Sequence, residues 1–216
     1  MSPHQPDSDI EPTTSPTRAP ARPKRWQRLA RLLTEVLAPA PIVATLLIVV
    51  AWHSAQTPTQ ALTAGLLAAL FASIIPFAYI VRGVRRGQLT DHHVGIREQR
   101  RIPLLFGIAS VIAGTSLLAA LRAPRDLIAL IIAMLGGLAT SLLVTLRWKI
   151  SVHTAVAAGA STILTLIFGP TLLTTAPLVA AIAWARVTIG DHSPTQTIAG
   201  ACLGITVAAT IFPTLR

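Results

Sequence analysis

The feature that most constrains this fold is a series of long apolar runs separated by short polar, glycine or proline breaks. A helix needs roughly 20 predominantly apolar residues, with about 17 as the lower limit, to cross the hydrocarbon core of a bilayer. Seven runs approach or exceed that length and carry charged side chains only at their ends, at about 36–53, 61–82, 103–122, 126–146, 152–169, 171–186 and 197–213. They predict an all-α, polytopic transmembrane bundle of about six or seven helices.

The number of spans depends on the break at Gly169-Pro170, between the fifth and sixth runs. A proline removes a backbone donor and either ends or kinks a helix. This pair is therefore either a connection between two spans or a kink within one. Pro177, inside the sixth run, leaves the same alternatives open, and the sequence is compatible with both six and seven spans.

The N-terminal segment has a different composition from the rest of the chain. Residues 1–25 are rich in proline, serine and threonine and contain almost no large apolar side chains. Such a segment buries too little surface to offset the entropy that it would lose on ordering. We predict a disordered tail over 1–25 and a transmembrane domain over 26–216, with the basic stretch around Trp26 as an interfacial anchor.

Basic residues indicate which end of the bundle faces the cytoplasm. If seven helices alternate across the bilayer, the N-terminal arm and the connections at 82–102, 147–151 and 187–196 share one side. The 18 Lys and Arg residues lie on or next to that side, except Arg122, Arg125 and Arg216. Because cytoplasmic loops carry the excess of Lys and Arg, we predict a multi-pass protein of the cell membrane with this side in the cytoplasm.

The net charge of +10 does not indicate a nucleic-acid partner. The cations lie in the connections and the N-terminal arm, whereas a nucleic-acid site gathers them on one continuous face. A single cysteine, Cys202, excludes an intramolecular disulfide and a cysteine-based metal cage. Its apolar neighbours predict a small packing role in the core.

Three polar patches interrupt the apolar pattern, and all three fall on the predicted cytoplasmic side. They are the segments 91–103, 147–153 and 185–196. Each combines arginine or lysine with histidine at the end of a predicted span. Ionisable groups that face the interior of a membrane bundle are costly, and they usually mark a functional site.

The residue types in these patches point to phosphate chemistry. Guanidinium groups match the oxygens of a phosphate, and a helix that begins near Ser151 would aim free backbone N–H groups at the same anion. Histidine supplies a nitrogen nucleophile or a proton donor near neutral pH. Phosphoryl transfer needs both kinds of group.

The third patch resembles the last motif of the type 2 phosphatidic acid phosphatase superfamily (PAP2). That motif reads Ser-Arg, five residues, His, three residues, Asp. The same spacing joins Arg186, His192 and Gln196 in this chain.

The other two patches resemble the remaining motifs of that family, in the same order. Ile150-Ser151-Val152-His153 is similar to its Pro-Ser-Gly-His, and the first patch is similar to its Lys, six residues, Arg-Pro, with Arg97 and Arg100 as the matching residues. The resemblance covers about 83–212.

The resemblance implies a PAP2-like helical domain and a membrane lipid-phosphate phosphatase. Its substrate would be a phosphate or diphosphate monoester of an isoprenoid or a glycerolipid. His192 would attack phosphorus to form a phosphohistidine, and His153 would protonate the leaving oxygen. The phosphoryl oxygens would be bound by Arg97, Arg100, Lys149, Ser151 and Arg186. The implied mechanism uses no metal and no other cofactor, and the implied partners are the lipid substrate and membrane lipids.

Gln196 stands where the family has an aspartate, and this departure leaves other functions open. The family's carboxylate orients the nucleophilic histidine and stabilises its positive form. A glutamine can accept a hydrogen bond from the imidazole but carries no charge. The alternatives are a catalytically impaired PAP2-like protein that binds an anionic lipid or a partner, and a prenyl or phosphoryl transferase that uses the same site.

Asp91, His92 and His93 form a short run of possible metal ligands. A structural zinc site takes four protein ligands, and no fourth ligand lies at a suitable spacing. The sequence therefore favours a solvated loop or cap over a metal site.

Overall fold

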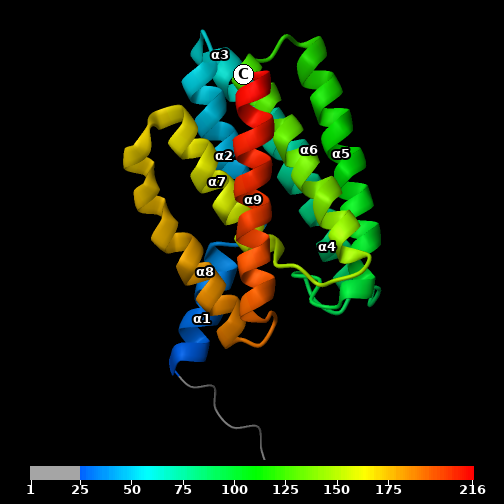
Figure 1. Ribbon diagram of the computed structural model, residues 1–216. Helices are drawn as coiled ribbons and strands as arrows, with labels where there is room; N and C mark the ends of the chain where they lie inside the picture. The colour runs from blue at the N-terminus through cyan, green and yellow to red at the C-terminus, as the bar shows by residue number, and fades with distance from the viewer. Residues whose placement is uncertain (1–24) are drawn as a thin grey trace, which may run out of the picture.

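A computed structural model describes residues 25–216 as a bundle of helices, with no strand among these residues (Figure 1). The predicted disordered tail lies outside the described residues, apart from Arg25, which is the first residue of α1. The α-helices of the described part are α1 Arg25–Val36, α2 Pro39–Ser54, α3 Pro58–Ala69, α4 Ile75–Arg85, α5 Arg101–Ala120, α6 Arg125–Thr145, α7 Val152–Phe168, α8 Ala176–Thr188 and α9 Pro194–Leu215. The predicted all-α class is confirmed.

The helices have the length and composition of membrane spans. Five helical segments of the described chain are long and apolar enough to cross a bilayer, namely Pro58–Arg85, Arg97–Ala120, Arg125–Thr145, Pro170–Thr188 and Pro194–Leu215. A sixth is added if α1 and α2, which are bent by 42° at their junction, count as one span. α7 has 17 residues, which is about the lower limit for a span. The predicted polytopic helical bundle is confirmed.

Three short segments of π-helix or 3-10 helix join or precede the α-helices. A π-turn at Leu70–Ile74 joins α3 to α4, and 3-10 turns at Arg97–Arg100 and Pro170–Thr175 precede α5 and α8. α7 ends at Phe168, and Gly169 takes a φ of +94°, which glycine adopts at little cost. The chain then turns back through Pro170–Thr175, so the Gly169-Pro170 break is a connection between two helices and not a kink within one.

α7 and α9 lie side by side, and glycines allow their backbones to approach closely. Gly200 of α9 faces the carbonyl of Ser151, and Gly204 faces the carbonyl of Ala155, so that a Cβ atom at either position would collide with backbone. Small residues at helix contacts are typical of bundles in lipid, where close van der Waals packing replaces the hydrophobic effect. This contact aligns the N-terminal ends of the two helices.

The polar connections gather at one end of the bundle. Figure 1 shows α1, the α4–α5, α6–α7 and α8–α9 connections and the start of α9 at its lower end, whereas α3 and the C-terminus lie at the opposite end. All three polar patches belong to the lower end. Cys202, in contrast, is exposed on α9, so the predicted packing role in the core is wrong because that face of α9 has no neighbouring helix to cover it.

Gly204→Ala is expected to destabilise the bundle because the added Cβ meets the Ala155 carbonyl and the Gly159 backbone. Overpacking of this kind costs about 1–3 kcal/mol, or roughly 2–12 °C in Tm for a chain of this size. Gly107→Ala is the matched control, since a Cβ at Gly107 meets no atom within 4 Å. Thermal unfolding in detergent compares the two, and equal Tm values would contradict the packing account.

Candidate functional site

His192 lies between α8 and α9, and Gln196 determines which ring nitrogen carries its proton. Nδ1 of His192 is 3.0 Å from Oε1 of Gln196. The backbone N–H of Ser193 donates to the same Oε1 at 3.2 Å, which identifies this atom as the accepting amide oxygen. Nδ1 therefore carries the proton and Nε2 keeps its lone pair. The predicted hydrogen bond between the imidazole and Gln196 is confirmed.

The surroundings of His192 keep its ring neutral. The side chain is 6% exposed. Burial, together with the positive charges of Arg100 and Arg186, lowers the pKa of His192 to about 3, although the hydrogen bond with Gln196 acts in the opposite direction. A neutral imidazole with an unprotonated Nε2 is the form of histidine that acts as a nucleophile.

His153 lies in the first turn of α7, next to the residue that caps this helix. Ser151 is fully buried, and its hydroxyl oxygen accepts a hydrogen bond from the backbone N–H of Thr154 at 3.5 Å. The backbone N–H of Ser151 donates to the carbonyl of Gln196 at 3.2 Å, which joins the start of α7 to α9. The predicted helix start near Ser151 is confirmed. His153 is 4% exposed and interacts electrostatically with Arg186 and His192.

Arg186, at the end of α8, is a fully buried cation with a single acidic contact. Its Nη2 lies 2.9 Å from Oδ2 of Asp191, but this ion pair does not have the angles of a hydrogen bond. Nε, Nη1 and Nη2 of Arg186 all lack a hydrogen-bond partner among the described residues, as do Nε2 of His153 and Nε2 of His192. Because buried polar atoms are nearly always hydrogen-bonded, this group of five atoms marks a binding site for a polar ligand.

Arg100 and Lys149 add positive charge around the same group. Arg100 is 5% exposed, and its Nε and Nη1 donate to the carbonyls of Val94 and Ile150, both at 2.8 Å. These two bonds fix its guanidinium between two connections. Lys149 is partly buried, and burial and the charge of Arg100 lower the pKa of its amine.

Arg97 has different partners from the other residues predicted to bind phosphate. Its Nη2 pairs with Oε1 of Glu98 at 3.1 Å, and its Nη1 donates to the carbonyl of Leu146 at 3.4 Å. More than a third of its side chain, 37%, is exposed. The structure thus brings Arg100, Lys149, Ser151 and Arg186 around the two histidines, whereas Arg97 contacts the surface of the neighbouring connection.

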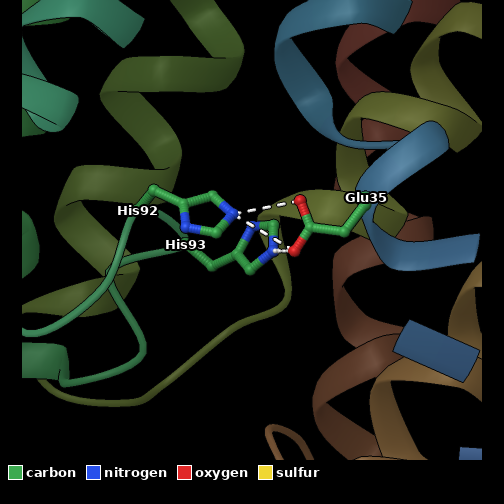
Figure 2. A group of neighbouring side chains, drawn as sticks. All are labelled: Glu35, His92 and His93. Atoms are coloured by element: carbon green, nitrogen blue, oxygen red, sulfur yellow. Dashed lines mark hydrogen bonds and ion pairs between the residues drawn. The ribbon is translucent and has the colours of Figure 1, made fainter. Parts of the chain in front are cut away.

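A second polar group lies beside His153 and includes a residue that the sequence analysis missed. Figure 2 shows Glu35, from α1, with its carboxylate against the imidazoles of His92 and His93. Nε2 of His92 is 3.1 Å from one carboxylate oxygen, and Nε2 of His93 is 3.0 Å from the other. The ring of His93 packs edge-on against that of His153, with centroids 5.0 Å apart. The two polar groups are therefore contiguous.

Asp91, His92 and His93 lie in a partly exposed loop, as predicted, but the contacts that the two histidines make were not predicted. The carboxylate of Asp91 accepts hydrogen bonds from the backbone N–H groups of His93 and Gly95, which is a capping role. His92 and His93 instead contact Glu35. One sequence feature could have identified Glu35 as a candidate site residue: it is the only acidic residue between Glu11 and Asp91.

An apolar cavity of about 290 Å³ adjoins the polar end of the bundle. Its polar lining comes from His92, His93, Arg100 and His153, together with Ser73 and Ser141. The rest of its wall is mostly apolar and comes from α2, α4, α5, α6, α7 and α9, with Leu46, Val111, Leu130, Ile163 and Val207 among the lining residues. Arg186 and His192 are outside the lining, so the cavity meets the candidate site at Arg100 and His153.

Comparison of the chain with models of known protein families, with curated proteins and with solved structures finds no match.

The low pKa of His192 predicts a pH-dependent stability. In the unfolded chain a histidine titrates near pH 6.5, whereas in the folded chain His192 titrates near 3. As the pH falls from about 6.5 toward 3, only the unfolded chain takes up this proton, so the free energy of unfolding decreases by up to about 1.4 kcal/mol per pH unit. The stability is fully present above about pH 6.5.

His192→Asn removes this titration while keeping an N–H donor near Gln196. Thermal unfolding in detergent between pH 7 and 4.5 is expected to show a shallower loss of stability for this variant than for the unmodified chain. Identical slopes would contradict a neutral, buried His192.

Proposed function

We propose that this chain is a membrane lipid-phosphate phosphatase that works through a phosphohistidine at His192. The observation that carries the proposal is the fully buried guanidinium of Arg186, which has no hydrogen-bond partner among the described residues and lies with the unpaired Nε2 atoms of His153 and His192. A phosphoryl group supplies the oxygen acceptors that these atoms lack, and it adds negative charge to that of Asp191.

The charge around the site supports an anionic ligand over a neutral one. Arg100, Lys149 and Arg186 surround His192, and each adds positive potential at its ring. Asp191 offsets part of this charge through its contact with Arg186. A phosphate dianion would neutralise the remainder, and such positioning and charge stabilisation supply most of the catalysis in phosphoryl transfer.

In the proposed reaction, the lone pair of His192 Nε2 attacks phosphorus and the bond from phosphorus to the lipid oxygen breaks. The bound dianion favours protonation of His153, and His153 gives this proton to the leaving oxygen. A water molecule, deprotonated by His153, then attacks phosphorus, and the bond from phosphorus to Nε2 of His192 breaks. The products are the lipid alcohol, inorganic phosphate and neutral His192. With a diphosphate substrate, the bridging oxygen is the leaving oxygen and the lipid product is the monophosphate.

Gln196 orients His192 but does not neutralise the positive charge that develops on its ring. Its amide oxygen accepts from Nδ1, so it keeps Nε2 in the nucleophilic tautomer as an aspartate would. The missing charge predicts a slower phosphoryl transfer than a carboxylate would permit, because a carboxylate stabilises the positive ring that forms during the reaction.

The apolar cavity supports a lipid substrate, either an isoprenoid or a glycerolipid. It joins the polar end of the bundle at Arg100 and His153 and is walled by aliphatic side chains. Sites of this kind hold the apolar part of a ligand while a few polar groups fix its reactive end. A lipid substrate with its phosphate at His192 and its hydrocarbon chain directed toward the cavity would place both its reactive end and its apolar part in suitable surroundings.

Phosphate release by the purified chain tests the proposal, with a polyprenyl phosphate, a polyprenyl diphosphate and phosphatidic acid as substrates. His192→Ala is expected to lower the rate about a thousandfold or more, as removal of a nucleophile does. His53→Ala is the matched control, since His53 packs against Phe168 at the other end of the bundle. Circular dichroism checks that each variant keeps its helix content.

Two results would overturn this proposal. One is a failure of the unmodified chain to release phosphate from any of the three substrates. The other is release that is equally fast in His192→Ala. Substrate binding without release would indicate the impaired, ligand-binding alternative, and transfer of label to an acceptor other than water would indicate a transferase.

We also propose that the site faces the cytoplasm from the cell membrane, since most Lys and Arg residues lie at its end of the bundle. In a Cys202→Ser chain, Thr195→Cys is expected to resist an impermeant thiol reagent in intact cells and to react after permeabilisation. Thr59→Cys, exposed at the opposite end, is expected to react in intact cells. The reverse pattern would place the site outside the cytoplasm.

A further inference from the structure

Three potential metal ligands converge from two distant parts of the chain. Glu35 comes from the last turn of α1, and His92 and His93 come from the α4–α5 connection. A ligand atom from each of them lies within 4.8 Å of the other two. Figure 2 shows both imidazoles presenting a nitrogen to the same carboxylate.

We propose that Glu35, His92 and His93 form a binding site for Zn²⁺. Two imidazoles and one carboxylate are the ligand set of a zinc site that keeps its fourth position open to water. Imidazole nitrogen suits zinc, copper and nickel, whereas magnesium and calcium take oxygen ligands. The site does not depend on the proposed phosphatase, whose residues use no metal.

The spacing from the carboxylate to each imidazole is close to that of a tetrahedral zinc centre. At the usual zinc–nitrogen and zinc–oxygen lengths of about 2.0–2.1 Å, tetrahedral ligands lie roughly 3.3 Å apart. Oε1 of Glu35 lies 3.2 Å from His92 Nε2 and 3.0 Å from His93 Nε2. Zinc therefore requires these pairs to separate by only a few tenths of an ångström.

The chain around the two histidines holds them in this orientation. The Asp91 carboxylate accepts the backbone N–H groups of His93 and Gly95, which fixes the turn from which both side chains project. The two imidazole rings lie 4.1 Å apart between centroids. A metal site needs ligands that are positioned before the metal arrives, and this turn supplies that support.

The exposure of the ligands also suits a metal. The side chains of Glu35 and His92 are 55% and 40% exposed, which gives an ion a path from water.

Zinc at this position would join α1 to the α4–α5 connection beside the candidate phosphate site. His93 lies between the proposed ion and His153, whose ring it contacts. The ion would add a second link between α1 and the rest of the bundle, in addition to the packing of α1 against α8.

The test measures zinc binding to the full-length chain, purified in detergent through a tag that contains no histidine. After removal of metal with a chelator, we expect saturable binding of one Zn²⁺ per chain, and no competition from Mg²⁺. Glu35→Gln and His93→Ala should each weaken binding by about a hundredfold or more, since even the loss of a residue that supports a ligand costs 10–100-fold. Glu98→Gln is the matched control, because Glu98 is an exposed carboxylate that pairs with Arg97.

Co²⁺ provides a second measurement that reports geometry. The Co²⁺-loaded chain should show the visible absorption of a four-coordinate centre, and Glu35→Gln should lack it. Glu35→Gln keeps an amide oxygen that can accept from the imidazoles, and circular dichroism confirms that it folds. Absence of saturable zinc binding, or equal affinity in Glu35→Gln and Glu98→Gln, would overturn the proposal; the second result would assign the ion to other ligands.

Discussion

The close contact between α7 and α9 is the constraint on which the candidate site depends. Gly200 and Gly204 leave no room for a Cβ against the backbone of α7, and the Ser151 N–H donates directly to the Gln196 carbonyl. The N-terminal ends of the two helices therefore lie together. Because His153 belongs to the first turn of α7 and His192 precedes α9 by two residues, the same contact brings the two imidazoles into one site.

The second element of the site is a positive charge that the bundle buries without fully compensating it. Arg186 has no exposed surface, and Asp191 is its ion-pair partner. Burying a charge is costly unless it is paired and hydrogen-bonded. The packing of α7 against α9 has to offset this cost in the free energy of folding. The same charge helps to keep His192 neutral. The α7–α9 contact, the buried Arg186 and the neutral His192 together form a site suited to an anion. This site is the basis of the proposed phosphatase.

The sequence predicts the fold better than it predicts the site. Apolar runs, Gly169-Pro170 and the start of α7 at Ser151 are local signals, and the helices follow them. The resemblance to the family's last motif also predicted the contact between His192 and Gln196. Contacts between distant segments are not predicted by the local pattern. Glu35 meets His92 and His93 because α1 and the α4–α5 connection both lie at the polar end of the bundle. Arg97 turns to Glu98 and Leu146 although it lies three residues from Arg100.

Trapping the covalent intermediate tests the central claim most directly. The chain is mixed with a lipid substrate that carries a radioactive phosphate, stopped within milliseconds in alkali, which preserves phosphohistidine, and digested for mass spectrometry. The account predicts label on Nε2 of His192, since its Nδ1 is held by Gln196, and no label in His192→Ala. Phosphate release without labelled His192, or label on another residue, would contradict it.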